Sequence, residues 1–382
     1  MMAERGGPHV LMTVEQLRRS VPGGIGAYAR GLLSGLAAND SAGTEVDITL
    51  YASRFRGGGT TPDPLEGFGR PVVLSRLPGP LMIRSWDRGF SRLPAGFDIV
   101  HSVSLASPPQ RGSHRAASVI TVHDLAWRRY PNATTRRGRR WHEAALRRAR
   151  DSDARLVVTS GFVAADLADD GVDSDRITIV QGGSDHLVAA DPEATASVLR
   201  QLGVANQFIL TVGTLEPRKN LDRLLAAYAQ VRPTLPEPWP LVIVGPDGWG
   251  PARPRSEDHD GVVFAGAVAD GVLSGLYEQA RAFVYVPLTE GYGLPPLEAM
   301  RSGVPSVVSS EVPSVHDLGQ TDPAPVLIVD PLDVDAIAEA LLVVLTDEAV
   351  RADLAQRGKT YALARTWAAA AQSHVTLWSS LT

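Results

Sequence analysis

The feature that most constrains this chain is a repeated alternation of short apolar runs with segments of helical periodicity. The runs are rich in valine, isoleucine and leucine, which is typical of strands buried on both faces of a parallel sheet. In the first half we predict strands at 9–14, 46–51, 72–77, 98–103, 118–122 and 155–159, with a helix at 24–36. This alternation predicts a doubly wound α/β layer.

A second alternation follows a stretch without a clear strand, 182–206. The predicted strands are 208–212, 240–244, 262–265, 282–286, 304–309 and 326–329, and the predicted helices are 221–231, 272–280, 295–302, 333–346 and 348–360. The chain therefore has an α/β fold class with two domains, at 1–190 and 200–365. Because open parallel sheets bind ligands at the carboxyl ends of their strands, we expect a site in a cleft between the domains.

Composition excludes several classes of protein. The 382 residues are enough for two domains, and the net charge of -5 gives no sign of nucleic-acid binding. With no cysteine, disulfides, thiol nucleophiles and Cys-ligated zinc are excluded. The polar start of the chain and the lack of a long apolar run predict a cytoplasmic protein, with the inner face of the plasma membrane as an option.

The stretch 287–305 contains two glutamates eight residues apart, Glu290 and Glu298. Pro295 and Pro296 indicate the first turn of a helix, where proline is tolerated. The pattern predicts a strand, a turn with Glu290, and a helix with Glu298 in its first turn. Such a helix start can bind phosphates. The alternative is that Glu298 only stabilises the helix dipole and Glu290 is a solvated loop acid.

A second candidate anion site lies at 213–220, where a strand ends and a helix opens. Gly213 follows the strand, and Arg218 and Lys219 stand just before the helix, which invites a phosphate. The alternative is that the two cations only pair with Glu216 in a loop.

The first half offers weaker signals. Gly24 and Gly26 form a G-x-G-x-x-A pattern, which predicts a glycine-rich loop. This loop follows its strand too late for a dinucleotide-binding fingerprint. The loop is either a phosphate-binding helix start or a tight turn. His123, followed by Asp124, ends a predicted strand, where α/β enzymes place reactive groups; a turn or a core histidine is the alternative. His101 also ends an apolar strand.

The segment from Arg128 to Arg150 holds nine arginines and one acid, Glu143. It is either a solvated helix face or an electropositive surface for an anionic acceptor or membrane leaflet. Three of the D-x-D triplets begin at Asp151, Asp173 and Asp333; helix caps explain these three better than a metal site. No metal or other cofactor is expected.

The ordered set of motifs resembles the retaining glycosyltransferases of family four, which have the GT-B fold and an E-x7-E motif. The matching segments are G-G-I-G-A-Y at 23–28, T-V-H-D-L at 121–125, V-G-T-L-E-P-R-K-N at 212–220, L-V-I-V-G-P-D-G-W at 241–249 and T-E-G-Y-G-L-P-P-L-E-A-M at 289–300. The family's habit of returning its last helix to the first domain matches 366–382. One departure is 311–319, where the family's Pro-Glu pair is replaced by His316 and Asp317.

This resemblance implies two Rossmann-like domains and a role for each matching residue. Glu298 would accept hydrogen bonds from the ribose, and Glu290 would contact the donor sugar. Arg218 and Lys219 would neutralise the diphosphate, and His123 would approach the reacting carbon. Backbone groups implied to border the same nucleotide-sugar site are those of Gly24, Gly26, Gly213, Gly245, Gly291, Tyr292, Gly293 and Leu294.

The implied activity is metal-independent transfer of a hexose from a nucleotide diphosphate sugar to a glycan, glycolipid or other hydroxyl acceptor, with retained configuration. Mannose from GDP-mannose is the preferred donor, and UDP- and dTDP-sugars stay open. A nucleotide-sugar 2-epimerase and a catalytically silent partner subunit are the rival interpretations.

Overall fold

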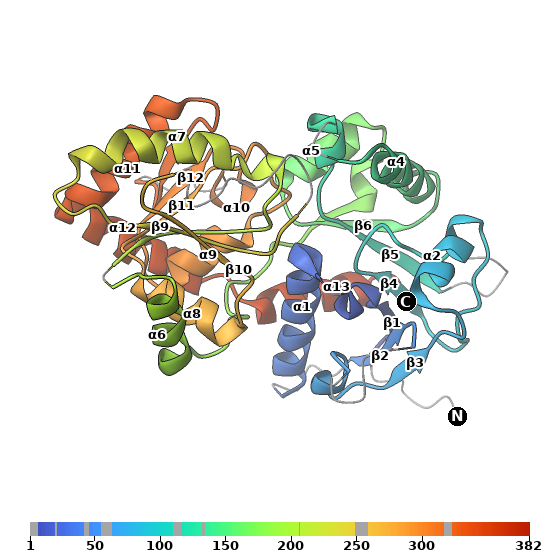
Figure 1. Ribbon diagram of the computed structural model, residues 1–382. Helices are drawn as coiled ribbons and strands as arrows, with labels where there is room; N and C mark the ends of the chain where they lie inside the picture. The colour runs from blue at the N-terminus through green and yellow to red at the C-terminus, as the bar shows by residue number, and fades with distance from the viewer. Residues whose placement is uncertain are drawn as a thin grey trace. The chain divides into compact units, whose positions relative to one another are not determined.

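The computed structural model describes residues 7–19, 21–41, 46–54, 63–109, 116–131, 134–205, 207–248, 259–316 and 323–382. The chain forms two compact units. The first contains Met1–Trp127, Thr134–Gly183 and Thr366–Thr382, and the second contains Arg128–Ala133 and Ser184–Arg365 (Figure 1). The chain passes from the first unit to the second between Gly183 and Ser184. The predicted domain ranges are 1–190 and 200–365.

The first unit is built on a parallel sheet. Its strands are β1 (His9–Thr13), β2 (Asp47–Ala52), β3 (Val72–Leu74), β4 (Ile99–Ser102), β5 (Ala117–Val122), β6 (Arg155–Val158) and β7 (Ile177–Ile179). Their order is β3-β2-β1-β4-β5-β6-β7, so the direction of winding reverses between β1 and β4. The helices of this part are α1 (Gly23–Ser41), α2 (Gly79–Asp87), α3 (Ala126–Arg129), α4 (Arg136–Arg150), α5 (Gly161–Asp169) and α13 (Trp367–Ser379).

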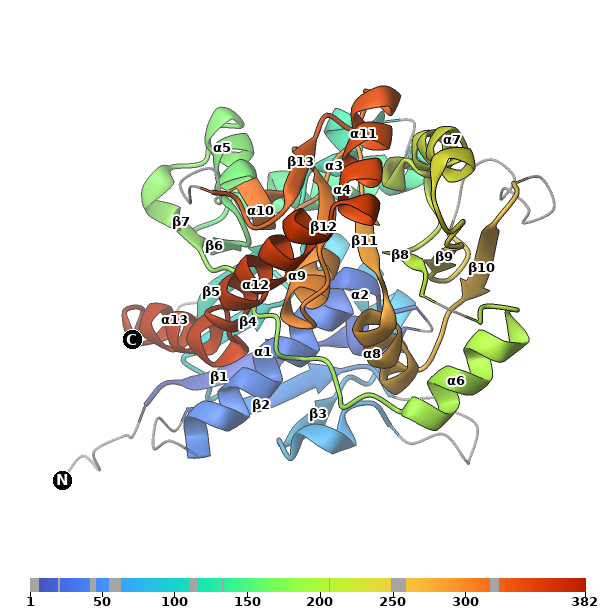
Figure 2. The ribbon, with the colours of Figure 1, turned by 90° about the vertical axis from the view of Figure 1, so that its left-hand side faces the viewer.

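Helices cover both faces of this sheet. Apolar residues of α4 and α5 pack on β5 and β6, and those of α2 pack on β1 and β4. On the other face α13 lies beside α1, as both ribbon views show (Figures 1 and 2). A Cβ at Gly31 of α1 would lie 2.0 Å from the Trp367 indole, so only glycine permits this contact. The predicted return of the last helix to the first domain is therefore confirmed.

The second unit also has a parallel sheet. Its strands are β8 (Ile209–Val212), β9 (Leu241–Val244), β10 (Val262–Gly266), β11 (Ala282–Tyr285), β12 (Ser306–Ser309) and β13 (Leu327–Val329). The order β10-β9-β8-β11-β12-β13 is the Rossmann order 3-2-1-4-5-6, with its switch point between β8 and β11. The helices are α6 (Pro192–Gln201), α7 (Leu221–Val231), α8 (Asp270–Gln279), α9 (Leu294–Arg301), α10 (Pro313–His316), α11 (Val334–Thr346) and α12 (Glu348–Leu363).

The period-two pattern of the strands explains the two hydrophobic cores of this unit. Leu210 and Val242 point to the face covered by α6, α8 and α9. Their neighbours Ile209 and Leu241 point to the face covered by α7 and α11. Both faces are buried, as the apolar runs predict, because successive strand side chains alternate between them. The predicted doubly wound α/β fold class is confirmed.

Sequence reasoning gave no range for several elements, among them α5, α6, α2 and β7. Helix α6 lies in the stretch 182–206, where Asp191 caps it by accepting the Ala194 N–H at 3.0 Å. Helix α2 and strand β7 were also not predicted; each is short, and β7 has a burial pattern without a fully buried residue. Short elements at a sheet edge carry little periodicity, so tertiary packing decides them.

Candidate nucleotide-sugar site

The residues of the predicted anion site in the second unit come together at the switch point of its sheet. The loop after β8 carries Arg218 and Lys219 in a short 3-10 helix, η5 (Pro217–Lys219). The loop after β11 carries Glu290. The Leu288 N–H donates to the Arg218 carbonyl at 2.8 Å, which joins the two loops. Residues 71 positions apart are thus brought together where Rossmann sheets bind ligands.

Three donors converge on one oxygen of Glu290. The Lys219 Nζ and the Tyr285 hydroxyl donate to Oε1, the latter at 2.7 Å, and Arg218 Nη1 lies 3.1 Å away. Only 10% of the Glu290 side chain and 12% of the Lys219 side chain are exposed. In the described part of the chain no donor contacts Oε2, so this oxygen keeps its hydrogen-bond capacity.

Arg218 has a second acidic partner. Its Nε lies 2.5 Å from Oε1 of Glu216, which meets the alternative for this loop only in part, because Lys219 pairs with Glu290 and not with Glu216. The cluster of Glu216, Arg218, Lys219 and Glu290, which we call the charged cluster, thus contains two acids and two cations. A ligand phosphate would have to share the cations with these carboxylates.

Burial and charge act against each other in the charged cluster. Burial alone would raise the pKa of Glu290, but Arg218 and Lys219 outweigh it and lower this pKa to about 2. Burial also lowers the pKa of Lys219, and the negative charge of Glu290 offsets part of that shift. Burial and the same carboxylate hold the pKa of Tyr285 well above its usual value, so its hydroxyl stays a donor.

Asn220 fixes the loop that carries the cations. Its φ of 59° lies in the left-handed region, which asparagine tolerates better than most residues. Its buried Nδ2 donates to the carbonyls of Val286 and Pro331 at 2.9 and 2.7 Å. Sequence reasoning took Asn220 only as the start of a helix, because nothing local to it reveals partners so far along the chain.

The helix α9 corrects one prediction. It begins at Leu294, with the prolines next, so Glu298 is its fifth residue and lies beyond the first turn. Glu298 is 6% exposed. It accepts hydrogen bonds from His186 Nε2 at 2.9 Å and from the Tyr277 hydroxyl at 2.8 Å. The helix-dipole interpretation of Glu298 fails, because a buried mid-helix acid gains little from the dipole.

The turn before α9 is tightly packed. Gly293 has a φ of +95°, and a Cβ there would lie 2.4 Å from Val312 Cγ1, so glycine is required. The Ser314 side chain donates to the Gly293 carbonyl at 2.7 Å, and the Ser314 N–H donates to the carbonyl of Tyr292 at the same distance. Gly291 is buried in this turn, and Leu294 is half-buried at the start of α9.

Gly213 and Gly245 lie side by side at the ends of β8 and β9. The Gly213 N–H donates to the Val244 carbonyl at 2.8 Å. A Cβ at Gly213 would lie 3.3 Å from Lys219 Cε, so the lysine side chain rests over this glycine. Gly213 and Lys219, predicted to lie near the phosphates, and Gly245, predicted to border the base of the nucleotide, therefore lie at one edge of the sheet. Trp249 and Asp317, which belong to the quoted segments, lie outside the described residues, and so does the side chain of His316.

In the first unit the structure joins two of the predicted features. Helix α1 begins at Gly23, so Gly24 and Gly26 are part of its first turn and not of a preceding loop. Tyr28 of the same helix makes an edge contact with the His123 ring at 4.9 Å. His123 Nε2 lies 2.8 Å from the Val103 carbonyl, and burial lowers the pKa of its imidazole.

The arginine-rich segment divides into two parts. Arg128 and Arg129 are the last residues of α3 and already belong to the second unit, in which Arg129 lies 3.7 Å from Glu311. In α4 the C-terminal arginines are paired: Arg148 with Asp87 at 2.6 Å and Arg150 with Asp151 at 3.0 Å. For the remaining arginines of α4, no acidic partner is found among the described residues; they are Arg136, Arg137, Arg139, Arg140 and Arg147. No helix in the described ranges is long and apolar enough to cross a bilayer.

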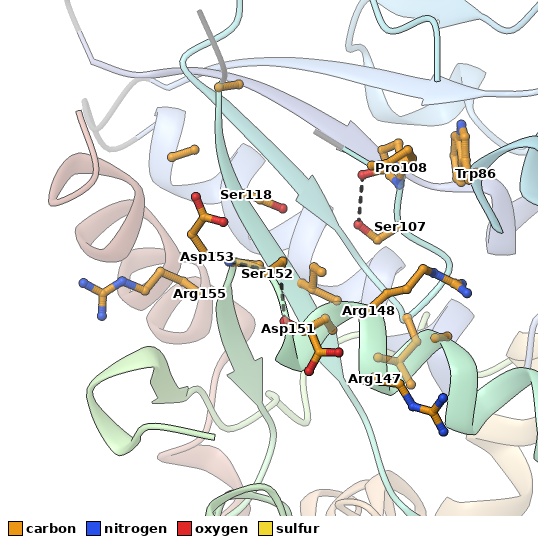
Figure 3. Close-up of a pocket in the computed structure, with 18 of the residues that line it drawn as sticks. Trp86, Ser107, Pro108, Ser118, Arg147, Arg148, Asp151, Ser152, Asp153 and Arg155 are labelled. Carbon is orange, nitrogen blue, oxygen red and sulfur yellow. Dashed lines mark hydrogen bonds between the residues drawn. The ribbon is translucent and has the colours of Figure 1, made fainter. Parts of the chain in front are cut away.

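The first unit also contains a cavity of about 650 Å³ (Figure 3). It is lined by the amino ends of β5 and β6 and by the end of α4, with Arg147 and Arg148 at its border. None of the predicted catalytic or donor-binding residues lines it. His123 follows the opposite, carboxyl end of β5.

The D-x-D triplets act as caps in two of three cases. Asp173 accepts the Asp175 N–H, and Asp333 accepts the N–H groups of Asp335 and Ala336, all at 3.0 Å. Across the ranges that the structure describes, no three histidine, aspartate or glutamate side chains are grouped so as to hold a metal ion.

The fold defines a class of protein with two Rossmann-like units, and the charged cluster lies at the switch point of the second. Two family models match its halves: Glycosyltransferase Family 4 over residues 22–186, and Glycosyl transferases group 1 over residues 201–361. The chain is 31% identical over 258 residues to the O-antigen chain mannosyltransferase B of Escherichia coli. The alignment covers 65% of this chain and 67% of the relative.

Other relatives agree on the family. The GDP-mannose-dependent alpha-(1-6)-phosphatidylinositol monomannoside mannosyltransferase of Mycolicibacterium smegmatis is 26% identical, over 89% of this chain and 90% of the relative. The serotype-specific mannosyltransferases WbdA of Escherichia coli are longer, and the chain spans only a quarter or less of their length. The sucrose-phosphate synthase of Thermosynechococcus elongatus has the same fold, with a TM-score of 0.70 at 20% identity, over 98% of this chain and 99% of that one.

The chain therefore belongs to glycosyltransferase family 4 and is a glycosyltransferase of the GT-B fold.

Proposed function

We propose that the protein transfers a hexose from a nucleotide diphosphate sugar to a hydroxyl acceptor of a glycan or glycolipid, with retained configuration and without a metal ion. The charged cluster carries this proposal. It places two cations and an ionised glutamate at the switch point, next to the start of α9. Diphosphate and sugar hydroxyls are the groups that such a set of residues complements.

The chemistry needs stabilisation of the leaving diphosphate. Negative charge develops on its oxygens as the bond to the sugar breaks, and Arg218 and Lys219 are fixed beside that position in a largely buried site. The leaving phosphate oxygen can take the proton of the acceptor hydroxyl, so no protein base is required. Glu290 is ionised at neutral pH, because its pKa is about 2, and its Oε2 can hold sugar hydroxyls. A covalent role for Glu290 is not needed in this scheme.

We propose GDP-mannose as the donor. The support is the set of relatives named as mannosyltransferases, one of them GDP-mannose-dependent. The fold neighbour HepE of Anabaena, at 17% identity, was crystallised with UDP and glucose, so UDP-sugars remain the alternative. The roles implied for His123, Gly24 and Gly26 stay predictions.

A thermal-shift panel with GDP-mannose, UDP-glucose, UDP-N-acetylglucosamine, dTDP- and ADP-sugars tests the donor. A ligand at a hundred times its Kd stabilises the folded state by about 2.7 kcal/mol, so the true donor gives a clear rise in Tm. We expect GDP-mannose to give the largest rise. A larger rise with a UDP- or dTDP-sugar would replace the donor, and no rise with any of them would contradict the proposed function.

We also propose that α4 presents an anion-binding surface. Arg136, Arg137 and Arg139 occupy its first turn, where cations destabilise a helix, and Arg140 follows directly, so the presence of the first three is not explained by stability. The surface suits an acceptor or lipid leaflet that carries negative charge.

Reversing charge in the variant Arg139→Glu/Arg140→Glu should abolish binding to vesicles that contain phosphatidylglycerol. It should not lower Tm, because the helix dipole favours acids at this end. The variant Arg200→Glu/Lys359→Glu changes net charge equally and serves as control. Equal binding by both variants would show that α4 is only a solvated helix face.

A further inference from the structure

The two glutamates of the donor site are held in different ways. Glu290 lies among lysine and arginine side chains, whereas Glu298 is held by a histidine and a tyrosine: His186 Nε2 donates to Oε1 at 2.9 Å, and the Tyr277 hydroxyl donates to Oε2 at 2.8 Å. In the described part of the chain no lysine or arginine pairs with Glu298. Burial and the Glu298 charge hold the pKa of Tyr277 well above its usual value, so this hydroxyl keeps its proton.

The hydrogen-bond capacity of Glu298 is only half used. A carboxylate offers about four lone-pair positions, two on each oxygen. One position on Oε1 is filled by His186 and one on Oε2 by Tyr277, which leaves one on each oxygen. Two adjacent acceptor positions match two neighbouring hydroxyls, the pattern that a ribose presents at its 2′ and 3′ carbons.

The cost of this arrangement argues for a ligand. The Glu298 side chain is 7% exposed and that of His186 is 9% exposed. Burying a carboxylate without a lysine or arginine partner costs folding free energy, because no permanent opposite charge compensates for the lost hydration. Glu298 also lies in the middle of α9, so the helix dipole stabilises its charge only slightly. Such an acid is retained most readily where it binds something.

His186 is itself fixed from several directions. It lies two residues after Ser184, the first residue of the segment Ser184–Arg365 in the second unit. The Ser184 N–H donates to the Arg365 carbonyl at 3.0 Å, and its hydroxyl donates to Ala362 at 2.7 Å. Arg301, one turn after Glu298 on α9, donates to the Ser184 hydroxyl at 3.3 Å. The segment before α6 is therefore clamped between α9 and the end of α12.

We propose that His186 and Tyr277 are positioning residues that orient the Glu298 carboxylate toward the two hydroxyls of the donor ribose. This inference rests on the proposed function, in which Glu298 binds the ribose. Neither residue belongs to the matched motifs, and His186 lies in the stretch where sequence reasoning found no element. They act through Glu298 and need not touch the substrate.

Calorimetric titration with GDP and with 2′,3′-dideoxy-GDP tests this role, with UDP and its dideoxy analogue in parallel. We expect His186→Ala and Tyr277→Phe each to weaken GDP binding about five- to twentyfold, the effect of one lost hydrogen bond to a charged group. Binding of the dideoxy nucleotide should change less than twofold. Tyr277→Phe keeps the ring that lies 5.8 Å from Phe283, so packing is preserved.

Two further variants separate the possible failures. His186→Gln retains an N–H donor and should recover most of the GDP affinity. Glu298→Ala should weaken GDP but not the dideoxy nucleotide. If Glu298→Ala changes neither, or the wild type binds neither GDP nor UDP, the proposed function fails. If Glu298→Ala discriminates but His186→Ala and Tyr277→Phe affect both nucleotides equally, or neither, only the positioning role is overturned.

Discussion

Each unit of this protein buries a polar cluster beside its sheet, and the two clusters differ in charge. In the second unit the charged cluster holds two cations and two carboxylates at the switch point. In the first unit the cluster is neutral: His101 Nε2 lies 2.9 Å from Thr121 Oγ1, and His374 Nε2 lies 2.9 Å from the Tyr28 hydroxyl. The two histidine rings stack at 5.3 Å.

The difference separates binding from packing. The charged cluster stands at the carboxyl edge of its sheet and leaves Oε2 of Glu290 without a protein donor among the described residues. The neutral cluster, which we call the histidine cluster, is fully buried and joins α13 to α1 and β4. Burial keeps its histidines neutral and lowers the pKa of His374 to about 4. We therefore assign ligand binding to the charged cluster as a proposal, while the histidine cluster holds the last helix in place.

The largest effect is expected at the histidine cluster. Trp378→Ala removes a fully buried indole that contacts His101 and His374, and should lower the free energy of unfolding by about 3–5 kcal/mol. Denaturant unfolding measures this loss. GDP affinity at a temperature where the variant stays folded should not change. A large loss of GDP affinity in the folded variant would contradict the division of roles.

A smaller effect is expected at the charged cluster. Lys219→Ala should weaken binding of the nucleoside diphosphate by about 1–3 kcal/mol, because a charge-assisted contact to phosphate is lost. Titration calorimetry gives the change, and the exposed Lys359→Ala is the matched control. The two clusters would not be distinct if Lys219→Ala altered only stability.

As pH falls, the histidine cluster should lose its contribution to stability before the charged cluster does. The folded-state pKa of His374 is lowered from 6.5 to about 4, so its contribution to stability is complete above pH 6.5 and is lost as pH falls toward 4. The loss is on the order of 1–2 kcal/mol at pH 5. Glu290, with a pKa of about 2, loses its contribution only below its usual pKa of 4.5. Hydrogen exchange at pH 5 should therefore speed up in α13 before it does so around Glu290; the reverse order would refute this.

The smallest effect concerns the charge balance of the charged cluster. Glu216→Gln frees Arg218 from one of its two acids, so diphosphate affinity should rise, by less than about 1 kcal/mol for a partly exposed pair. The change is measurable as a modest fall in Kd at low salt. A weaker affinity would show that Glu216 orients Arg218 and does not compete for it.

Periodicity was enough to predict both sheets and most of their helices, because strands buried on both faces leave long apolar runs in the sequence. The loops that carry the candidate site residues could also be predicted, since Rossmann sheets bind ligands at the ends of their strands. The hydrogen-bond partners of the residues in these loops could not be predicted. Tyr285 reads as one more apolar strand residue, and its bond to Glu290 follows only from the three-dimensional turn of the loop.

Long-range partners explain the other misses. Asn220 contacts Val286 and Pro331, and His186 contacts a glutamate 112 positions away. No local pattern encodes such pairs. The start of α9 was wrong by one residue, which moved Glu298 from the fourth to the fifth helical position, because the prolines fix a helix start only within a residue or two. Conversely, the ordered motifs were sufficient to find the family before any contact was known.

The central claim is that Arg218 and Lys219 hold the diphosphate of the donor without a metal. The most direct measurement is titration calorimetry of GDP and GMP, in excess chelator, with the wild type and with Lys219→Ala. We predict that the wild type binds GDP at least tenfold more tightly than GMP and that this difference collapses in the variant. Equal affinities in the wild type, an unchanged difference in the variant, or a strict requirement for Mn²⁺ or Mg²⁺ would contradict the account.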